Sequence, residues 1–215
     1  MKINIPTKIT LVRIAAVALL ILFLIVCTFL PADSFASAYL GDSGISVINL
    51  IVCIVFIIAS ATDYLDGHLA RKWNQVTTLG KFLDPIADKM LVNTMLVYLC
   101  VPLLFNPSPI PWFCVAFMIL RDLVVDTMRF LAASKGKVVA ANIFGKMKTV
   151  FQMIAIPFAL LGGWPFTYFD ANWGYGRICY ILIYIATAMS IISGVIYLKD
   201  NFHILKEENN DESHA

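Results

Sequence analysis

Six long apolar stretches limit this chain to a small set of folds. Each is close to or above the length of about 17 to 25 residues that crosses a bilayer as a helix. They lie at roughly 10–30, 45–70, 83–105, 109–133, 146–163 and 176–198. Because 60% of the residues are hydrophobic and only 14% are charged, the chain has too few polar side chains to cover a soluble domain. We therefore expect an all-α integral membrane protein with six transmembrane helices and a short amphipathic N-terminal segment.

The segments between these stretches contain Pro, Gly, Asn and Ser, which interrupt helices. No internal repeat and no linker is visible, so we expect one membrane domain over residues 1–200. Residues 201–215 end in "KEENNDESHA", and their polarity predicts a disordered tail. The five cysteines all lie in apolar stretches without a CxxC pair, which indicates buried small side chains rather than disulfides or metal ligands.

Basic residues are concentrated in alternate loops. Lys2, Lys8 and Arg13 precede or open the first apolar stretch, and other Lys and Arg residues lie in the second and fourth loops and after the last stretch. The loops of the opposite side contain only Arg177. Because cytoplasmic loops are enriched in Lys and Arg, we expect a multi-pass protein of the cytoplasmic membrane with both termini in the cytoplasm.

The stretch "ATDYLDGHLARKWNQVTTLGKFLDPIADKM", residues 61–90, collects four aspartates on the predicted cytoplasmic side. Asp84 and Asp88 are four residues apart, so they share a face of one helix. An aspartate followed by Pro85 is a favourable helix start, which predicts that this helix begins at Asp84. The preceding helix carries another set of residues within roughly 140° of arc. That set consists of Asp63, Asp66, Gly67, Ala70 and Arg71.

Two antiparallel helices of this kind would direct four carboxylates into one space. Because like charges repel, such a cluster needs cations, and ligand sets made only of oxygen suit Mg²⁺ or Mn²⁺. Two ions that share carboxylates form a clamp for a phosphoryl group in transfer. Gly67 and Gly80 would admit a ligand close to the backbone, and Arg71 could pair with a pyrophosphate. The alternative is a solvated cytoplasmic loop with ion pairs, although such a loop has no need of helical spacing.

The pattern D-x2-D-G-x2-A-R-x8-G-x3-D-x3-D, from Asp63 through Asp88, resembles the signature of the CDP-alcohol phosphotransferases. These membrane enzymes move a phosphatidyl or phospho-alcohol group from a CDP-linked donor to an alcohol. The resemblance extends over nearly the whole chain. Four further blocks resemble the bacterial phosphatidylglycerophosphate synthases within that family: "NIPTKITLVRI", "FLDPIADKMLV", "RDLVVDTMR" and "VVAANIFGKMKTVFQMIA".

The resemblance implies a six-helix bundle, usually a homodimer, with its polar site at the cytoplasmic end. It implies that two divalent cations, Mg²⁺ or Mn²⁺, are held by the four aspartates, Asp63, Asp66, Asp84 and Asp88. Asp88 would also act as general base on the acceptor, sn-glycerol 3-phosphate, whose hydroxyl attacks the β-phosphorus of CDP-diacylglycerol and releases CMP. The residues implied to bind CDP-diacylglycerol are Asp66, Gly67, Ala70, Arg71 and Gly80. The partners expected are these substrates and the membrane, with no nucleic acid.

A phosphate-bearing acceptor also needs cations. Arg121 and Arg129 are eight residues apart, about 80° around one helix, and an arginine in hydrocarbon costs roughly 2.5–3.5 kcal/mol on insertion scales. We expect an acceptor-phosphate pocket made by Arg121, Arg129, Lys146 and Lys148. The alternatives are local pairing of the arginines with Asp122 and Asp126, and a Lys148 that reaches lipid headgroups.

Two positions depart from the subfamily, which usually reads R-E-x3-S/T-x2-R where this chain has Asp122 and Asp126. The added negative charge of Asp126 would weaken glycerol phosphate binding or indicate another acceptor. Near the N-terminus, Thr10 and Arg13 are candidates for contact with cytidine or lipid phosphate, or Arg13 is an interfacial anchor.

Three other functions remain open. The same chemistry would serve phosphatidylglycerol, as in a cardiolipin synthase, or inositol phosphate as acceptor. A divalent-cation transporter would place its acidic site near the membrane midplane between repeated halves, and no repeat is visible here. An aspartate-rich prenyltransferase would also bind Mg²⁺, but the D-G-x2-A-R and G-x3-D-x3-D spacing argues against it.

Overall fold

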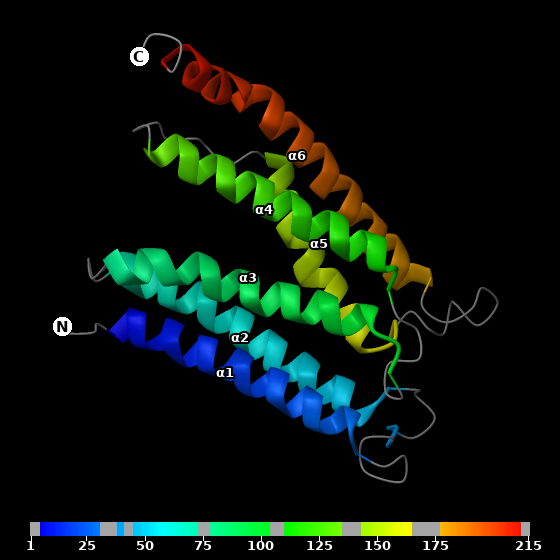
Figure 1. Ribbon diagram of the computed structural model, residues 1–215. Helices are drawn as coiled ribbons and strands as arrows, with labels where there is room; N and C mark the ends of the chain where they lie inside the picture. The colour runs from blue at the N-terminus through cyan, green and yellow to red at the C-terminus, as the bar shows by residue number, and fades with distance from the viewer. Residues whose placement is uncertain are drawn as a thin grey trace. The chain divides into compact units, whose positions relative to one another are not determined.

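The computed structural model contains six α-helices within its described residues, which are 5–30, 38–40, 45–72, 78–103, 110–134, 143–164 and 177–211 (Figure 1). Side chains are described there except at 5–6, 63–72, 78–82, 84–85, 177–179 and 202–211. The helices are α1 (Ile5–Thr28), α2 (Val47–Lys72), α3 (Thr78–Cys100), α4 (Trp112–Ser134), α5 (Ile143–Leu160) and α6 (Arg177–Asp211). The predicted all-α class is confirmed, and the described residues form six helices.

The ends of three helices differ from the prediction. The helix α3 begins at Thr78, so Asp84 and Pro85 lie inside it and the prediction that Asp84 starts the helix is wrong. Pro85 lacks the N–H that would donate to the carbonyl four residues earlier, and α3 nevertheless continues past it. The helix α1 begins at Ile5, so the amphipathic N-terminal segment and the first apolar stretch form one continuous helix.

The third difference lies in α6, which continues to Asp211 through the segment predicted to be disordered. Lys and Glu have high helix propensity, so a polar composition does not by itself end a helix. The disorder predicted for residues 201–215 stays a prediction. Residues 212–215 lie outside the described part of the chain.

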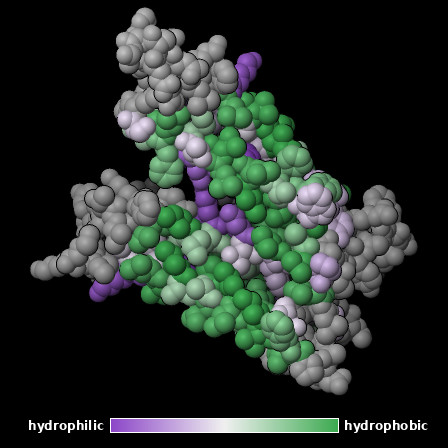
Figure 2. Space-filling model, in the orientation of Figure 1, coloured by the Kyte–Doolittle hydropathy of each residue, from purple (hydrophilic) through white to green (hydrophobic). Residues whose placement is uncertain are grey.

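Three helical segments are long and apolar enough to cross a membrane where the structure describes them: Thr7–Thr28, Ile143–Leu160 and Tyr180–Asn201. A shorter apolar segment covers Val47–Thr62. Large apolar side chains are exposed on these and other helices, and hydrophobic residues cover most of the described surface in view in Figure 2. A surface of this kind suits contact with lipid, so the fold is that of an integral membrane protein.

The chain forms two compact units. The first comprises Met1–Ile110 and Ile156–Cys179, and in it α1 packs against α2 and α3 while α2 packs against α3. The helix α2 runs opposite to α1 and α3. The N-terminus of α1, the C-terminus of α2 and the N-terminus of α3 therefore lie at one end of this unit (Figure 1).

A buried hydrogen bond joins α2 and α3 inside the first unit. The hydroxyl of Tyr98 donates to Oδ1 of Asn49, and both residues are only 6% exposed. We predict that Tyr98→Phe lowers the free energy of unfolding by about 1–3 kcal/mol, because it removes a buried donor from its acceptor. Thermal unfolding in detergent measures this effect. Tyr184→Phe, at an exposed position on α6, is the matched control, and equal unfolding midpoints for the two variants would contradict the prediction.

The second unit comprises Pro111–Ala155 and Tyr180–Ala215 and contains α4, most of α5 and α6 from Tyr180 onward. Val125 and Met128 of α4 form a buried apolar cluster with Tyr197 of α6, and Leu198 packs against it. Gln152 of α5 donates a hydrogen bond to Sδ of Met118 on α4, at 3.0 Å. These contacts hold the three helices together around a polar group described below.

Candidate active site

The first unit brings the two aspartate pairs to one end. Asp63 and Asp66 lie in the C-terminal part of α2, and Asp84 and Asp88 lie near the N-terminus of α3. Those two helix ends lie together in the unit (Figure 1). Because both segments are helical throughout, the spacing on which the expected common faces depend is present in the structure.

Of the predicted metal and donor residues, only Asp88 has a described side chain, and it is half-buried. The side chains of the others lie outside the described set: Asp63, Asp66, Gly67, Ala70, Arg71, Gly80 and Asp84. Among the described side chains, which include only one of the four aspartates, no three His, Cys, Asp or Glu groups lie close enough together to hold a metal ion. The donor set itself, carboxylate oxygens on two packed helices, fits hard divalent cations.

A buried polar face lies on α1 in the same unit. Thr7, Thr10 and Arg13 are 3%, 1% and 3% exposed, and they are spaced three residues apart near the N-terminus of α1. This is the end at which α2 and α3 carry the aspartates (Figure 1). Arg13 is therefore buried within the unit, and the interpretation of Arg13 as an interfacial anchor is wrong.

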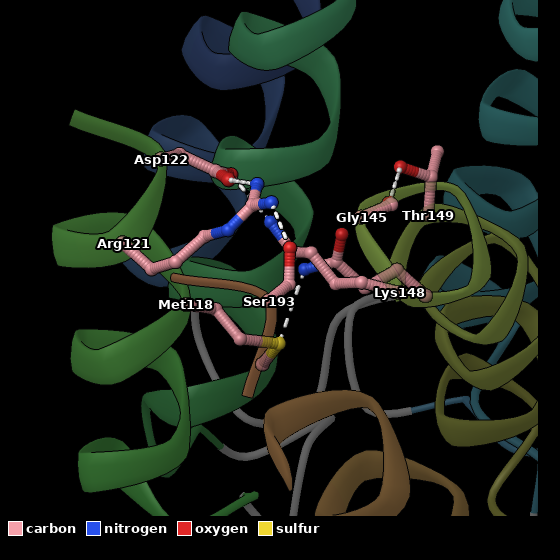
Figure 3. A network of polar contacts seen from close by, with 8 residues as sticks. Met118, Arg121, Asp122, Gly145, Lys148, Thr149 and Ser193 are labelled. Atoms are coloured by element: carbon pink, nitrogen blue, oxygen red, sulfur yellow. Dashed lines mark hydrogen bonds and ion pairs between the residues drawn. The ribbon is translucent and has the colours of Figure 1, made fainter. Parts of the chain in front are cut away.

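A second polar group lies in the other unit, where the guanidinium of Arg121 on α4 donates hydrogen bonds to two residues. Its Nη1 donates to Oδ1 of Asp122 at 2.9 Å, and its Nη2 donates to Oγ of Ser193 on α6 at 2.5 Å (Figure 3). The Nζ of Lys148, from α5, donates to the other carboxylate oxygen of Asp122 at 2.5 Å. Asp122 thus bridges two cations, and the group joins α4, α5 and α6.

Two glycines border the Arg121 side chain. A Cβ atom on Gly145 of α5 would lie 2.8 Å from Nη2 of Arg121, and one on Gly194 of α6 would lie 2.9 Å from its Cγ. A Cβ atom does not come this close to another heavy atom, so only glycine fits at either position without a shift of the Arg121 side chain. The sequence shows Ser193 and Gly194 as a pair of small residues in an apolar helix, a signal of close helix approach that does not identify the arginine they contact.

The four cations predicted to bind the acceptor phosphate differ in burial and in contacts. Arg121 and Lys148 meet at Asp122, so the local pairing considered for Arg121 is present, and the acceptor-phosphate role of both cations stays a prediction. Lys148 is 3% exposed, so it does not reach toward lipid headgroups. Arg129 is exposed, with its guanidinium carbon 5.8 Å from the centre of the Tyr197 ring, and Lys146 is also exposed.

Comparison with known proteins identifies the family. Residues 3–193 match the model of the CDP-alcohol phosphatidyltransferases, a span that includes the aspartate stretch and the Arg121 group. The chain belongs to this family. It is 38% identical to the CDP-diacylglycerol–glycerol-3-phosphate 3-phosphatidyltransferase of Bacillus subtilis over 96% of this chain and 99% of the relative.

Relatives of the same name occur in other bacteria. The protein of Haemophilus influenzae is 35% identical over 93% of this chain and 94% of its own length. That of Rickettsia bellii is 33% identical over 91% of this chain and 94% of its own length. The resemblance drawn from the motifs is therefore confirmed over nearly the full chain.

Proposed function

We propose that this CDP-alcohol phosphatidyltransferase transfers the phosphatidyl group of CDP-diacylglycerol to sn-glycerol 3-phosphate, which gives phosphatidylglycerol phosphate and CMP. The observation that carries the proposal is the match, over almost the full length of both chains, to relatives named for this reaction. The fold supports it, because two packed helices bring four aspartates of the family pattern to one end of a unit.

The four aspartates, Asp63, Asp66, Asp84 and Asp88, would hold two divalent cations, Mg²⁺ or Mn²⁺. When bound, these ions supply charge neutralisation on the diphosphate and on the departing CMP. Asp88 would accept the proton of the acceptor hydroxyl. That oxygen then forms a bond to the β-phosphorus, and the bond from this phosphorus to the oxygen of the CMP phosphate breaks. Asp88 is half-buried, as suits a residue that contacts both the fold and a substrate.

The donor would lie along the helical face that carries Asp66, Gly67, Ala70 and Arg71, with Gly80 opposite on α3. Glycine and alanine leave room for a bulky nucleotide close to the helix backbone. The guanidinium of Arg71 can donate paired hydrogen bonds to a diphosphate.

The acceptor phosphate would bind to Arg121 and Lys148. These two cations and one carboxylate, Asp122, leave a net positive charge in a group whose side chains are at most 14% exposed. A charge of this kind in a low-dielectric setting attracts a phosphate more strongly than an exposed lysine does. Arg129 and Lys146, both exposed, would add long-range attraction only.

We also propose the cellular arrangement of the enzyme. The distribution of Lys and Arg favours a multi-pass protein of the cytoplasmic membrane with both termini in the cytoplasm. The family resemblance favours a homodimer.

Removal of divalent cations is expected to abolish the reaction. Purified protein in detergent, given CDP-diacylglycerol and glycerol 3-phosphate, should release CMP with Mg²⁺ and lose this activity when EDTA is added in excess. The reason is that four uncompensated carboxylates would repel the diphosphate. Excess Mg²⁺ should restore the rate. The unfolding temperature with EDTA serves as the control for an intact fold, and full activity in metal-free folded protein would contradict the proposal.

A further inference from the structure

Two other helices border the Arg121 side chain, one at its middle and both at its tip. Gly194 of α6 lies against its Cγ, and Gly145 of α5 lies against its Nη2. At the tip, Oγ of Ser193 accepts from Nη2 while Asp122 accepts from Nη1 (Figure 3). An arginine has several rotatable bonds, and restraints at its middle and its tip select one orientation of the guanidinium plane.

The hydrogen bonds of Arg121 within the described residues leave several of its donors unused, which favours a role in ligand binding over a purely structural one. A guanidinium has five N–H donors, and the contacts to Asp122 and Ser193 use two. Its Nε is buried and has no hydrogen-bond partner in the described part of the chain. Buried donors are seldom left without an acceptor, so the ion pair with Asp122 and the bond to Ser193 do not account for every donor of this guanidinium.

We propose that Ser193, with Gly145 and Gly194, positions Arg121 for the phosphate of the acceptor, so that α6 takes part in acceptor selection. The proposal rests on the proposed function and adds residues that the aspartate pattern does not contain. Ser193 is a positioning residue, because it acts through Arg121. Its hydroxyl is completely buried, and its bond to Arg121 joins residues 72 positions apart in the chain.

The chain offers a matched control on the same helix. Ser190 lies one turn before Ser193, is equally buried and has no hydrogen-bond partner among the described residues. Ser190→Ala and Ser193→Ala therefore remove the same atom from equally buried positions. Only the second removes a bond to Arg121.

The test measures KM for glycerol 3-phosphate and for CDP-diacylglycerol separately, on purified full-length protein. Ser193→Ala is expected to raise KM for glycerol 3-phosphate about tenfold, the effect of one hydrogen bond to a charged group. The KM for CDP-diacylglycerol should stay unchanged, and Ser190→Ala should change neither. Gly194→Ala displaces the arginine itself and should raise the KM for glycerol 3-phosphate further. If the wild type uses another phosphate-bearing acceptor, the same series is run with that acceptor.

The outcomes separate this inference from the proposed function. An inactive wild type with every phosphate-bearing acceptor would overturn both. An active wild type, with unchanged acceptor KM in Ser193→Ala and Gly194→Ala, would overturn the positioning role alone. A merely structural role would lower the unfolding temperature and raise both KM values together, which would also overturn it. If Gly194→Ala does not fold, Ser193→Ala still decides the question, because it adds no atoms.

Discussion

Replacement of Asp88 by asparagine is expected to lower the rate of CMP release by at least about 100-fold, the lower range for loss of a general base. The amide has almost the same shape as the carboxylate but cannot accept the proton of the acceptor hydroxyl. It is also a weaker ligand for Mg²⁺. The measurement is kcat with both substrates and Mg²⁺ at saturation.

The control for this change is Asp200→Asn, which removes a carboxylate from an exposed position on α6 and should leave kcat unchanged. A titration with Mg²⁺ separates the two roles of Asp88. If added Mg²⁺ restores the full rate of Asp88→Asn, the residue is only a metal ligand. Wild-type activity in Asp88→Asn at ordinary Mg²⁺ would contradict both roles.

Replacement of Arg121 by alanine is expected to raise KM for glycerol 3-phosphate by roughly 10- to 150-fold, the value of one charge-assisted hydrogen bond of about 1.5–3 kcal/mol. The change leaves Asp122 paired with Lys148, so the group loses its net positive charge. KM for CDP-diacylglycerol should change little. Separate titrations of the two substrates measure this contrast.

Arg129→Ala is the comparison for Arg121. Arg129 lies on the same helix but is exposed and contacts the Tyr197 ring instead of the Asp122 group. Its replacement should raise the acceptor KM much less, because exposed charges are screened by salt. Equal increases in the two variants would show that the buried group has no special role in acceptor binding.

The helices could be predicted from the sequence because their signal is local. Apolar runs of sufficient length indicate helices whatever the tertiary contacts are. The residues at which the helices begin and end were harder to predict, because they depend on small differences in free energy. The Asp84–Pro85 pair has the pattern of a helix start, yet α3 begins at Thr78 and continues through Pro85 despite the backbone hydrogen bond that the proline removes. Similarly, the polar residues after 198 continue α6, since Lys and Glu favour helix.

The site was predictable only where its residues lie close together in the sequence. The aspartates follow helical spacing on two consecutive helices, and their placement at one end follows from the antiparallel packing of α2 and α3. The contact between Arg121 and Ser193 joins distant segments, and no spacing rule indicates it. Lys148 illustrates the same limit. A lysine at a helix start suggests a contact with lipid headgroups, but Asp122 of α4 provides a buried partner.

The most direct test of the central claim is a comparison of acceptors. Purified wild-type protein receives CDP-diacylglycerol and Mg²⁺ with glycerol 3-phosphate, phosphatidylglycerol or inositol phosphate, and both CMP and the lipid product are identified. We expect CMP and phosphatidylglycerol phosphate with glycerol 3-phosphate and no product with the other two acceptors. Product formation with a different acceptor only, or no CMP release with any acceptor from folded protein, would contradict the proposed function.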